Sequence, residues 1–359
     1  MARTYGKELG HCEGKGLRLV PDALALCKEH SFRILRNDDY FQSYYIDYRI
    51  IMSAIKQAFY LPFWWFRAKF FGRTAPLQSV IFISDRCNLS CKHCSVYNHK
   101  APVSKSWDQI KEELEYCYRL GSRFIDFEGG EPFLWEDPSH PVGSRPANVN
   151  DLCDLAHSLG FYSCTITSNA QKAFAGSHAD SIWVSMDGVG AYHDTIRGEG
   201  TFARLEKNAS ESGFKHLSAN MAINVHNADS VAAAIEYVKE KPYFESISLN
   251  FHTPFPGTEH LALPMEKRNR IIDLILDYKK KGYPIMNSKS GLKAMKSNKF
   301  KKRCWMTNFI YVDGTREPQC AGYKIPGLCD KCGFCMAGEE DAVMRLAPDT
   351  ILAGFKLRR

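Results

Sequence analysis

The stretch SVIFISDRCNLSCKHC, residues 79–94, decides the fold because it joins a short apolar run to a loop with three cysteines. The apolar part, residues 79–84, predicts a buried strand. Directly after it, Cys87, Cys91 and Cys94 form a C-x3-C-x2-C loop. Three thiolates at the carboxyl end of a strand make a soft metal site that suits an iron–sulfur cluster. Three cysteines rather than four leave one iron free to take an outside ligand.

A zinc ion is the alternative occupant of this loop. His93 or His99 would then supply the fourth ligand. Structural zinc sites usually come as two separated pairs of ligands, whereas these three cysteines lie together. The spacing therefore favours the iron–sulfur cluster.

Strands and helices alternate along the chain after this loop. Five more runs predict strands, at residues 123–128, 161–167, 182–186, 216–224 and 244–251. A helix opens at Ser106, with Gln109 completing a capping box, and ends at Gly121; another is capped by Asn150 and ends at Gly160. Further helices are predicted to begin near Phe202, Ser230 and Pro264.

Near-continuous apolar strands that alternate with helices predict an α/β fold, with a parallel sheet covered by helices. Six such units fit either a partial (βα)6 TIM-type barrel or a doubly wound sheet, and the periodicity does not choose between them. In both folds the functional residues lie beyond the carboxyl ends of the strands. The cysteine loop begins at such an end.

The segment IIMSAIKQAFYLPFWWFRAKFF, residues 50–71, dominates the N-terminal flank. It is too interrupted to span a bilayer, because its longest uncharged stretch is ten residues and Pro62 breaks the helix pattern. Dense aromatic residues beside Lys56, Arg67 and Lys69 suit the water–lipid boundary. We therefore expect peripheral membrane contact through residues 44–72. A helix packed against the barrel or against a protein partner is the alternative.

Composition excludes several classes of protein. With 359 residues, 45% of them hydrophobic, the chain is neither a small disulfide scaffold nor a disordered segment. The net charge of +7 is spread along the chain, which argues against nucleic acid as a partner. The start MARTYGKELG lacks the pattern of a secretory signal, so the thirteen cysteines are expected as thiols in the reducing cytoplasm. Of the scattered ones, Cys117 and Cys164 are predicted to be buried in the core.

The cysteine loop, with His93 just before its last cysteine, resembles that of the radical S-adenosylmethionine (radical SAM) superfamily. The agreement continues from residue 79 to about residue 285, which favours the partial barrel. The GGEP segment at residues 129–132 is similar to the family segment whose glycine backbone meets the methionine amino group of SAM. The third strand ends in a similar way to the family's, with Ala170 in place of the commoner glycine.

The fourth predicted strand leads into S-x-D-G, followed by H-D and R-G, at residues 185–198. This resembles the signature of the branch of the family that modifies peptides, in which the serine and arginine contact the SAM ribose and carboxylate. An arginine fork matches a carboxylate well. Taken together, the resemblance implies cofactor contacts from Gly129, Gly130, Glu131, Pro132, Asn169, Ser185, Asp187 and Arg197.

A second cysteine group follows near the C-terminus. Its members are Cys304, Cys320, Cys329, Cys332 and Cys335. The pattern resembles the SPASM and twitch extensions, which carry auxiliary iron–sulfur clusters, although the glycine-to-cysteine spacing is one residue longer than usual. The resemblance implies one auxiliary [4Fe–4S] cluster held by four of the five thiols, with either Cys332 or Cys335 left out. A zinc ribbon is the alternative.

The predicted function follows from the resemblance. The chain is expected to cleave SAM reductively to a 5′-deoxyadenosyl radical and to modify a peptide or protein by C–H activation, with electrons from a flavodoxin or ferredoxin. Radical modification or adenosylation of a membrane-associated lipid is the first alternative. Residues 335–343 are loosely similar to the tail of enzymes that attach adenosine to hopanoid lipids, and such a substrate would place the chain at the inner face of the membrane. A zinc-binding, non-catalytic interaction protein is the alternative from another class.

Three domains are expected from the sequence. They are a helical aromatic and basic extension at residues 1–78, a radical SAM core at 79–288 and an auxiliary-cluster region at 289–359. No catalytic residue beyond the cluster ligands is predicted.

Overall fold

The computed structural model describes the backbone of residues 39–94, 96 and 100–356, and it describes the side chains of residues 55–94, 96 and 100–354. The chain divides into two compact units, residues 1–52 and 53–359. The second unit contains the whole sheet and every helix after α1 (Asp39–Phe70), together with the last part of α1 itself. The predicted domain boundaries at residues 78 and 288 stay predictions.

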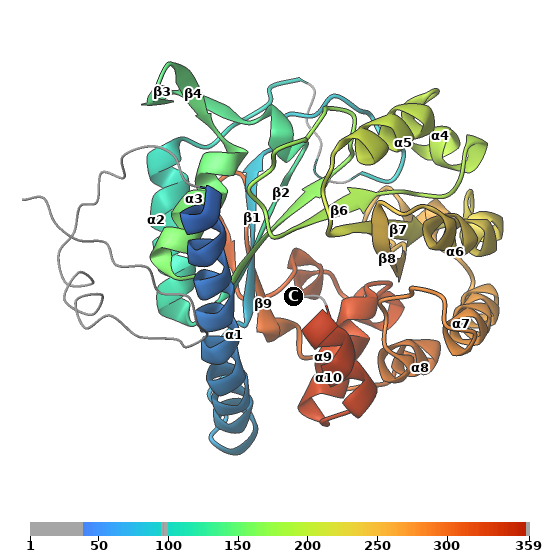
Figure 1. Cartoon of the computed structure of the whole chain (residues 1–359). Coiled ribbons are helices and arrows are strands. Elements are labelled where there is room, and N and C mark those ends of the chain that lie inside the picture. Colours follow the sequence, from blue (N-terminus) through green and yellow to red (C-terminus); the bar gives the residue numbers. More distant parts are fainter. Residues whose placement is uncertain (1–38, 95, 97–99, 357–359) are drawn as a thin grey trace, which may run out of the picture. The chain divides into compact units, whose positions relative to one another are not determined.

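Six parallel strands form the centre of the second unit (Figure 1). They are β1 (Gln78–Ser84), β2 (Phe124–Gly129), β5 (Ser163–Ser168), β6 (Ser181–Ser185), β7 (Leu217–Ile223) and β8 (Phe244–Phe251). They lie side by side in chain order, and each pairs in parallel with the next. In a doubly wound sheet the order of the strands reverses at a central strand. The observed order therefore confirms the partial (βα)6 TIM-type barrel.

The connecting helices cover the outer face of this sheet. They are α2 (Trp107–Leu120), α3 (Val149–Leu159), α4 (Ala191–Arg197), α5 (Thr201–Glu211), α6 (Val231–Glu240) and α7 (Met265–Lys280). As predicted, the Ser106 side chain caps α2 by accepting from the Gln109 amide, and Gly121 ends the helix with a left-handed φ of 113°. The predicted cap of α3 was wrong by two residues, because Asn148 and Asp151 form the capping box instead of Asn150.

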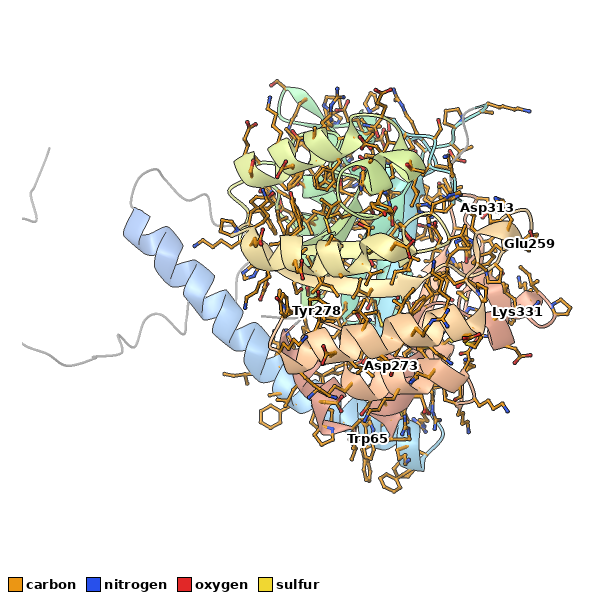
Figure 2. The ribbon with its side chains drawn as sticks, turned by 90° about the vertical axis from the view of Figure 1, so that its right-hand side faces the viewer. Trp65, Glu259, Asp273, Tyr278, Asp313 and Lys331 are labelled. Atoms are coloured by element: carbon orange, nitrogen blue, oxygen red, sulfur yellow. The ribbon has the colours of Figure 1, made fainter. Side chains whose placement is uncertain are left out.

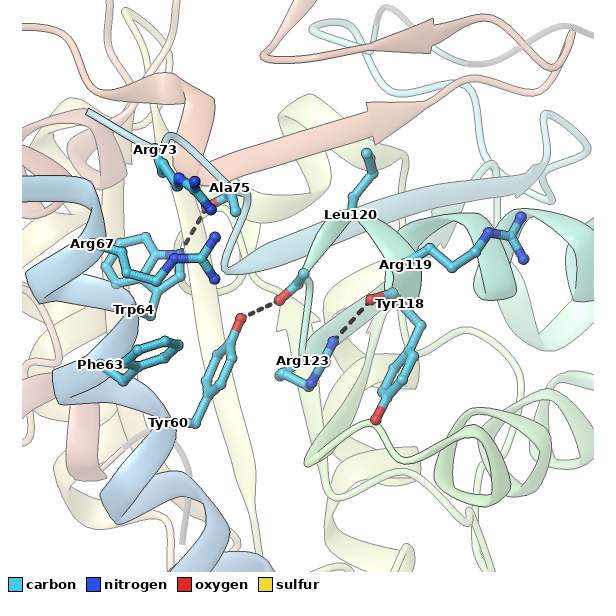
Figure 3. Close-up of a pocket in the computed structure, with 11 residues that line it drawn as sticks. Tyr60, Phe63, Trp64, Arg67, Arg73, Ala75, Tyr118, Arg119, Leu120 and Arg123 are labelled. Atoms are coloured by element: carbon cyan, nitrogen blue, oxygen red, sulfur yellow. Dashed lines mark hydrogen bonds between the residues drawn. The ribbon is translucent and has the colours of Figure 1, made fainter. Parts of the chain in front are cut away.

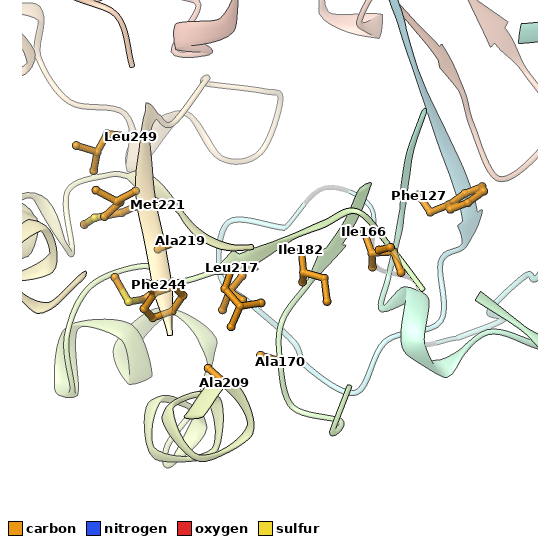
Figure 4. Packing of buried hydrophobic residues seen from close by; sticks show 14 of the residues in the cluster. Phe127, Ile166, Ala170, Ile182, Ala209, Leu217, Ala219, Met221, Phe244 and Leu249 are labelled. Carbon is orange, nitrogen blue, oxygen red and sulfur yellow. The ribbon is translucent and has the colours of Figure 1, made fainter. Parts of the chain in front are cut away.

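The strands alternate between two environments. One set of side chains is fully buried against the helices, and it includes Phe127, Ile166, Ile182 and Leu249 (Figure 4). The intervening side chains, on the inner face of the sheet, are mostly half-buried and polar. Cys117 and Cys164 belong to the apolar layer, as predicted.

Two strand pairs were not predicted. A hairpin of β3 (Glu136–Val142) and β4 (Arg145–Asn148) follows β2, after the short helix η3 (Pro132–Leu134). In the C-terminal region, β9 (Thr307–Ile310) pairs in parallel with β1, and β10 (Arg316–Glu317) pairs with β9. The C-terminal region therefore extends the sheet beyond its first strand.

Most of the remaining elements belong to the C-terminal region, which carries the second cysteine group. The helices are α8 (Lys289–Ser297), α9 (Cys335–Met344) and α10 (Pro348–Lys356). The short turns of helix are η4 (Ala228–Ser230), η5 (Glu259–Leu261), η6 (Cys304–Met306), η7 (Ala321–Lys324) and η8 (Cys329–Lys331). Helix α9 packs closely on α8 at Gly338. A Cβ at this position would collide with the Gly291 carbonyl, so the close contact requires glycine.

Helix α1 continues through Pro62, so the expectation that this proline breaks the helix was wrong. A proline inside a helix costs about 3 kcal/mol. Packing offsets this cost, since Trp64 and Ala68 are buried and the Trp64 indole donates to the Ala75 carbonyl at 2.8 Å. The indole of Trp65 donates to the Val343 carbonyl, which places it between α1 and the C-terminal helices (Figure 2). None of the helices in the described residues has the length and apolar character needed to cross a membrane.

Candidate cofactor and iron–sulfur site

The three-cysteine loop lies at the carboxyl end of β1, and its thiols lie close together. Burial raises the pKa of Cys91 to about 11, and Cys94 and Cys87 add to the rise. Burial also raises the pKa of Cys87, and Cys94 adds to that rise as well. Thiols in this environment ionise only when a metal binds them. The structure thus brings the three predicted ligands into one group.

Two side chains from neighbouring elements donate hydrogen bonds to two of these sulfurs. The side-chain amide of Asn169, just after β5, donates to Cys87 Sγ at 3.6 Å. The Arg197 guanidinium, at the end of α4, donates to Cys91 Sγ at 3.8 Å. The Lys92 amide donates to the Ile196 carbonyl at 3.0 Å and ties the loop to the same helix. Hydrogen bonds to sulfur are a known influence on the potential of an iron–sulfur cluster.

Asp187 holds Arg197 in this position. Its carboxylate accepts from Arg197 Nε at 2.6 Å and from the Ala222 amide at 2.9 Å, and His93 Nε2 lies 3.6 Å away. Burial raises the pKa of Asp187, but Arg197 and His93 outweigh burial and the pKa lies below its ordinary value. Asp187 therefore stays ionised and acts on the site through Arg197.

The two glycines of the GGEP segment allow β2 to approach the start of the cysteine loop. A Cβ on Gly129 would lie 2.2 Å from the Ser84 carbonyl oxygen, and one on Gly130 would lie 2.1 Å from the Arg86 carbonyl oxygen. These contacts exclude any side chain. The chain's own backbone thus requires glycine here, in addition to the contact with SAM that the family resemblance implies.

Glu131 links the ends of β2 and β5. It is 1% exposed. Its carboxylate accepts from the backbone amide of Asn169 at 2.7 Å, from Ser168 Oγ at 2.9 Å and from the backbone amide of Phe133 at 3.2 Å. Its side chain is committed to protein partners and fixes the residue that donates to Cys87. Pro132 begins η3 directly after it.

Two further residues of the predicted site, Ala170 and Ser185, lie at the ends of β5 and β6. Ala170 takes a left-handed φ of 57°, a conformation that glycine adopts more readily, which explains why glycine is the commoner residue here. Ser185 ends β6 half-buried, on the inner face of the sheet and two residues before Asp187.

Unpartnered polar atoms around the loop fit a bound cofactor. His93 Nδ1 is buried and has no hydrogen-bond partner among the described residues. No three His, Cys, Asp or Glu side chains of the described residues have the arrangement of a single-ion metal site. A [4Fe–4S] cluster binds each cysteine through a different iron, so its thiols stand farther apart than the ligands of one ion.

The second cysteine group also comes together. The pKa of Cys304 is raised above its ordinary value by burial first and also by Cys320, Cys332 and Cys329. Cys320 shows the same causes, burial first and then Cys332 and Cys329. For Cys335, which is fully buried at the start of α9, Cys332 is the thiol that contributes. These mutual effects on pKa indicate that Cys304, Cys320, Cys329 and Cys332 lie near one another, and that Cys335 lies nearest to Cys332.

Two cations lie beside the second cysteine group. Burial lowers the pKa of Lys302, while Cys332, Cys304 and Cys329 raise it. Arg268 is 4% exposed and donates through Nη1 to the Cys332 carbonyl at 2.7 Å. Its Nε and Nη2 are buried without partners in the described part of the chain. Unsatisfied cationic donors beside thiols fit a negatively charged cluster.

The sequence analysis did not predict Arg268. The sequence pattern could have indicated this residue, because Arg268 shares one face of α7 with Ile271, Ile272 and Ile275, all of them buried. A charged residue on an apolar helix face indicates a buried charge that needs a partner.

The inner face of the sheet is polar between the two cysteine groups. Its half-buried or buried polar side chains include Asp126, Glu128, Thr165, Thr167, Ser185, Asn220, Ser248 and Asn250. Thr167 Oγ1 donates to Asp126 at 3.3 Å, and Asn250 Nδ2 donates to Asn220 Oδ1 at 3.1 Å. Burial raises the pKa of Glu128 to about 7. This face offers hydrogen-bonding groups rather than an apolar surface.

Comparisons with known proteins agree with this geometry. Residues 81–238 match the model of the Radical SAM superfamily. The chain is 29% identical over 130 residues to pre-heme d1 synthase from Dinoroseobacter shibae, which covers 35% of this chain and 31% of that protein. It is 27% identical over 186 residues to PqqA peptide cyclase from Xanthomonas campestris pv. campestris, which covers 46% of each. The chain spans between 31% and 58% of the length of the first curated relatives.

Two solved structures extend the likeness of fold. Streptococcus suis SuiB bound to precursor peptide SuiA has a TM-score of 0.56 at 17% identity and covers 94% of this chain and 76% of its own. Native anSMEcpe with bound AdoMet and Kp18Cys peptide has a TM-score of 0.52 at 17% identity and covers 74% of this chain and 80% of its own. At these identities the likeness concerns the fold.

The matched model, the partial barrel and the three-cysteine loop identify residues 81–238 as a radical SAM domain. A cysteine-rich region follows this domain near the C-terminus. Radical SAM domains use a [4Fe–4S] cluster and SAM.

Proposed function

We propose that the chain cleaves SAM reductively and uses the resulting radical to modify a peptide or protein by C–H activation. When bound, the cluster and SAM supply one-electron cleavage of a carbon–sulfur bond, which yields methionine and a 5′-deoxyadenosyl radical. The observation that carries the proposal is the group of Cys87, Cys91 and Cys94, held between the ends of β1, β5 and α4. Arg197 and Asn169 orient this group through their bonds to sulfur.

The protein's own residues would orient the cofactors and exclude water from them. Glu131 and Asp187 are buried and fixed by several hydrogen bonds, so the donors that they hold are rigid. Rigid donors position a cofactor without a cost in side-chain entropy when it binds. A flavodoxin or ferredoxin is the proposed source of the electron.

A direct test is the Cys91→Ala variant, purified and reconstituted without oxygen. We expect the variant to hold about four fewer irons and sulfides than wild type and to release no 5′-deoxyadenosine from SAM and dithionite. Cys153→Ala is the matched control, because Cys153 is a buried thiol in the apolar core. Unchanged iron in Cys91→Ala would contradict the proposal, and stoichiometric zinc without iron in wild type would support the non-catalytic alternative.

A peptide or protein is the proposed substrate for two reasons. SuiB has been solved with a precursor peptide, and a curated relative is named a peptide cyclase. The inner face of the sheet carries amide, hydroxyl and carboxyl groups, which match the hydrogen-bonding groups of a peptide backbone. Mass spectrometry of anaerobic reactions with candidate precursor peptides tests this step, and a mass loss of two hydrogens or a cross-link would support it.

A lipid or other membrane-associated substrate is the second candidate, since α1 exposes a row of phenylalanines. That row lies on the helix that packs near the amino ends of the strands, where Tyr60 donates to the Gly121 carbonyl. The cysteine loop follows the carboxyl end of β1. The aromatic helix and the cofactor loop therefore lie at opposite ends of the strands, which favours the peptide.

The C-terminal region is proposed to hold one auxiliary [4Fe–4S] cluster, with residues 79–288 as the core and 289–359 as the region that carries it. The proposed ligands are Cys304, Cys320, Cys329 and Cys332. Support comes from the mutual effects of these thiols and from the two cations beside them. Cys335 is left out because Cys329 and Cys332, and not Cys335, are the late thiols that raise the pKa of Cys304 and Cys320.

A further inference from the structure

A pocket of about 250 Å³ lies at the amino-terminal end of the barrel, beside the starts of β1 and β2, whereas the cysteine loop follows the carboxyl end of β1. Figure 3 shows the residues that line this pocket. Its walls are the last part of α1, the segment between α1 and β1, and the turn between α2 and β2. Four of its lining residues are arginines, Arg67, Arg73, Arg119 and Arg123. No lining residue is an aspartate or a glutamate.

The positive charge of this pocket is largely unbalanced. Within the described residues, no carboxylate forms an ion pair with Arg67, Arg73 or Arg123. Arg119 has one weak partner, Glu115, at 3.7 Å, and both side chains are exposed. Several guanidinium groups around one small pocket repel each other, and a bound anion would remove that repulsion.

The walls of the pocket are fixed before any ligand binds. Arg123 Nη1 donates to the carbonyls of Tyr118 and Ser122 at 2.9 and 2.8 Å, and its guanidinium lies 3.8 Å from the centre of the Tyr118 ring. Tyr60 donates to the Gly121 carbonyl, and the Trp64 indole donates to the Ala75 carbonyl at 2.8 Å. These contacts hold the Arg123 guanidinium in place, with its positive charge beside the pocket.

An exposed aromatic surface adjoins the pocket on α1. Phe59 is 76% exposed, Phe63 is 57% exposed and Phe70 is 64% exposed. Together with Phe66 they recur every three or four residues and form one stripe, the phenylalanine face. Phe63 belongs to both features, because it lines the pocket and lies 5.4 Å below the Arg67 guanidinium. Trp64 and Ala68 on the opposite side of the helix are buried.

Charge and shape together select one kind of ligand. Arginine forks bind phosphate oxygens in pairs, so the pocket suits a phosphate group. A free phosphate would leave the phenylalanine face in water, whereas a phospholipid would cover it with acyl chains. We propose that this pocket binds the phosphate of an anionic phospholipid while the phenylalanine face enters the upper acyl layer. The enzyme then docks on the bilayer by the end of the barrel opposite its cofactor loop.

The test compares binding of the full-length holoenzyme to two kinds of vesicle, phosphatidylcholine alone and phosphatidylcholine with phosphatidylglycerol. We expect wild type to bind the anionic vesicles preferentially and to lose binding as salt rises. Arg67→Gln/Arg73→Gln should weaken that binding about 25-fold, since each basic residue at an anionic surface contributes about fivefold. Phe59→Ser/Phe70→Ser should weaken binding to both kinds of vesicle.

Arg204→Gln/Arg270→Gln is the matched control, because these arginines lie on α5 and α7 and the change in net charge is the same. Iron content and 5′-deoxyadenosine release in solution should stay unchanged in all three variants, which separates this proposal from the proposed function. Equal binding by Arg67→Gln/Arg73→Gln and the control would overturn the proposal. So would arginine-dependent binding of inorganic phosphate without vesicle binding, which would show a site for a free anion.

Discussion

Arg268 is a charged side chain where the packing pattern of α7 calls for an aliphatic one. Its guanidinium is buried, lies 4.9 Å from the centre of the Phe251 ring and donates to the Cys332 carbonyl. Burial lowers its pKa, while Cys335 and Cys332 favour its charged form. Such a residue would be costly without an anion nearby. We regard it as a positioning residue for the proposed auxiliary cluster.

Arg268→Met is predicted to lower the reduction potential of the auxiliary cluster by roughly 100 mV. Reduction adds negative charge to the cluster, and the variant lacks the cation that stabilises it. The measurement is a redox titration followed by electron paramagnetic resonance in a Cys91→Ala background, where only the auxiliary cluster remains. Arg270→Met, on the exposed side of the same helix, is the control and should leave the potential within about 20 mV. A potential that is equal in both variants would assign Arg268 a structural role only.

Glu128 is the second residue whose environment leads to a prediction. Burial raises its pKa from 4.5 to about 7, and the nearby Asp126 has a pKa raised by its own burial and by Glu128. Tyr311, directly after β9, also interacts with Glu128. A raised pKa in the folded state means that the stabilising contribution is complete below about pH 4.5 and is lost as the pH rises through 7.

Glu128→Gln should therefore become more stable relative to wild type as the pH rises from 5 to 8, by about 1–2 kcal/mol in the free energy of unfolding. Urea unfolding at several pH values measures this difference. Glu199→Gln, at an exposed position, provides the control. If the difference in free energy of unfolding between Glu128→Gln and wild type does not change with pH, Glu128 does not have a raised pKa in the folded protein.

At the scale of elements, a buried ion pair joins α2 to the loop before it. Lys105 Nζ lies 2.7 Å from Glu113 Oε2, and both side chains are at most 2% exposed. Burial raises the pKa of Glu113 and lowers that of Lys105, so each charge depends on the other. Removing one partner leaves an isolated buried charge, whereas removing both leaves an apolar contact.

Lys105→Met and Glu113→Leu are each predicted to lower the free energy of unfolding by about 3–5 kcal/mol, and the double variant by about 1–2 kcal/mol or less. Urea unfolding of the four proteins in this cycle gives the coupling energy. Glu112→Leu, an exposed neighbour on the same helix, is the control. Additive effects in the double variant would show that the two charges do not depend on each other.

The sequence predicts most of the elements because the strands of the barrel are apolar runs bounded by glycines and caps. β6, observed at Ser181–Ser185, was expected at residues 182–186, and α2 begins and ends as its capping box and Gly121 indicate. The hairpin β3–β4 was missed because its residues, such as Pro138 and Pro141, carry no strand pattern. β9 was missed because it has four residues and depends on pairing with β1, more than 220 positions away in the chain.

The cysteine loop can be found from the sequence alone, whereas the other candidate sites depend on long-range contacts. The loop of Cys87, Cys91 and Cys94 is local, so its spacing reveals it. The arginine pocket combines Arg67 and Arg73 with Arg123, and the auxiliary site combines Arg268 with cysteines more than 30 residues later. Only the packed chain brings such residues together, and no local pattern marks them as a group.

At the scale of the whole molecule, packing holds the barrel but leaves the segment between β10 and α9 with little support. Residues 318–334 form only the short turns η7 and η8, and most of their side chains are exposed or half-buried. Metal–thiolate bonds to Cys320, Cys329 and Cys332 would replace the missing core, as they do in small metal-binding domains. The stability of this segment should therefore depend on iron, whereas that of the barrel should not.

Anaerobic removal of iron is predicted to speed amide hydrogen exchange in residues 318–334 by roughly 10- to 100-fold, with β5 to β8 unchanged because their ladder and apolar layer remain. Hydrogen exchange with mass spectrometry measures both regions in one experiment. Cys329→Ala should behave like the iron-free protein, whereas Cys335→Ala should keep the iron and the slow exchange, because Cys335 lies outside the proposed ligand set. Fast exchange and lost iron in Cys335→Ala would instead make Cys335 a ligand. Equal exchange in the segment with and without iron would show that its own packing is sufficient.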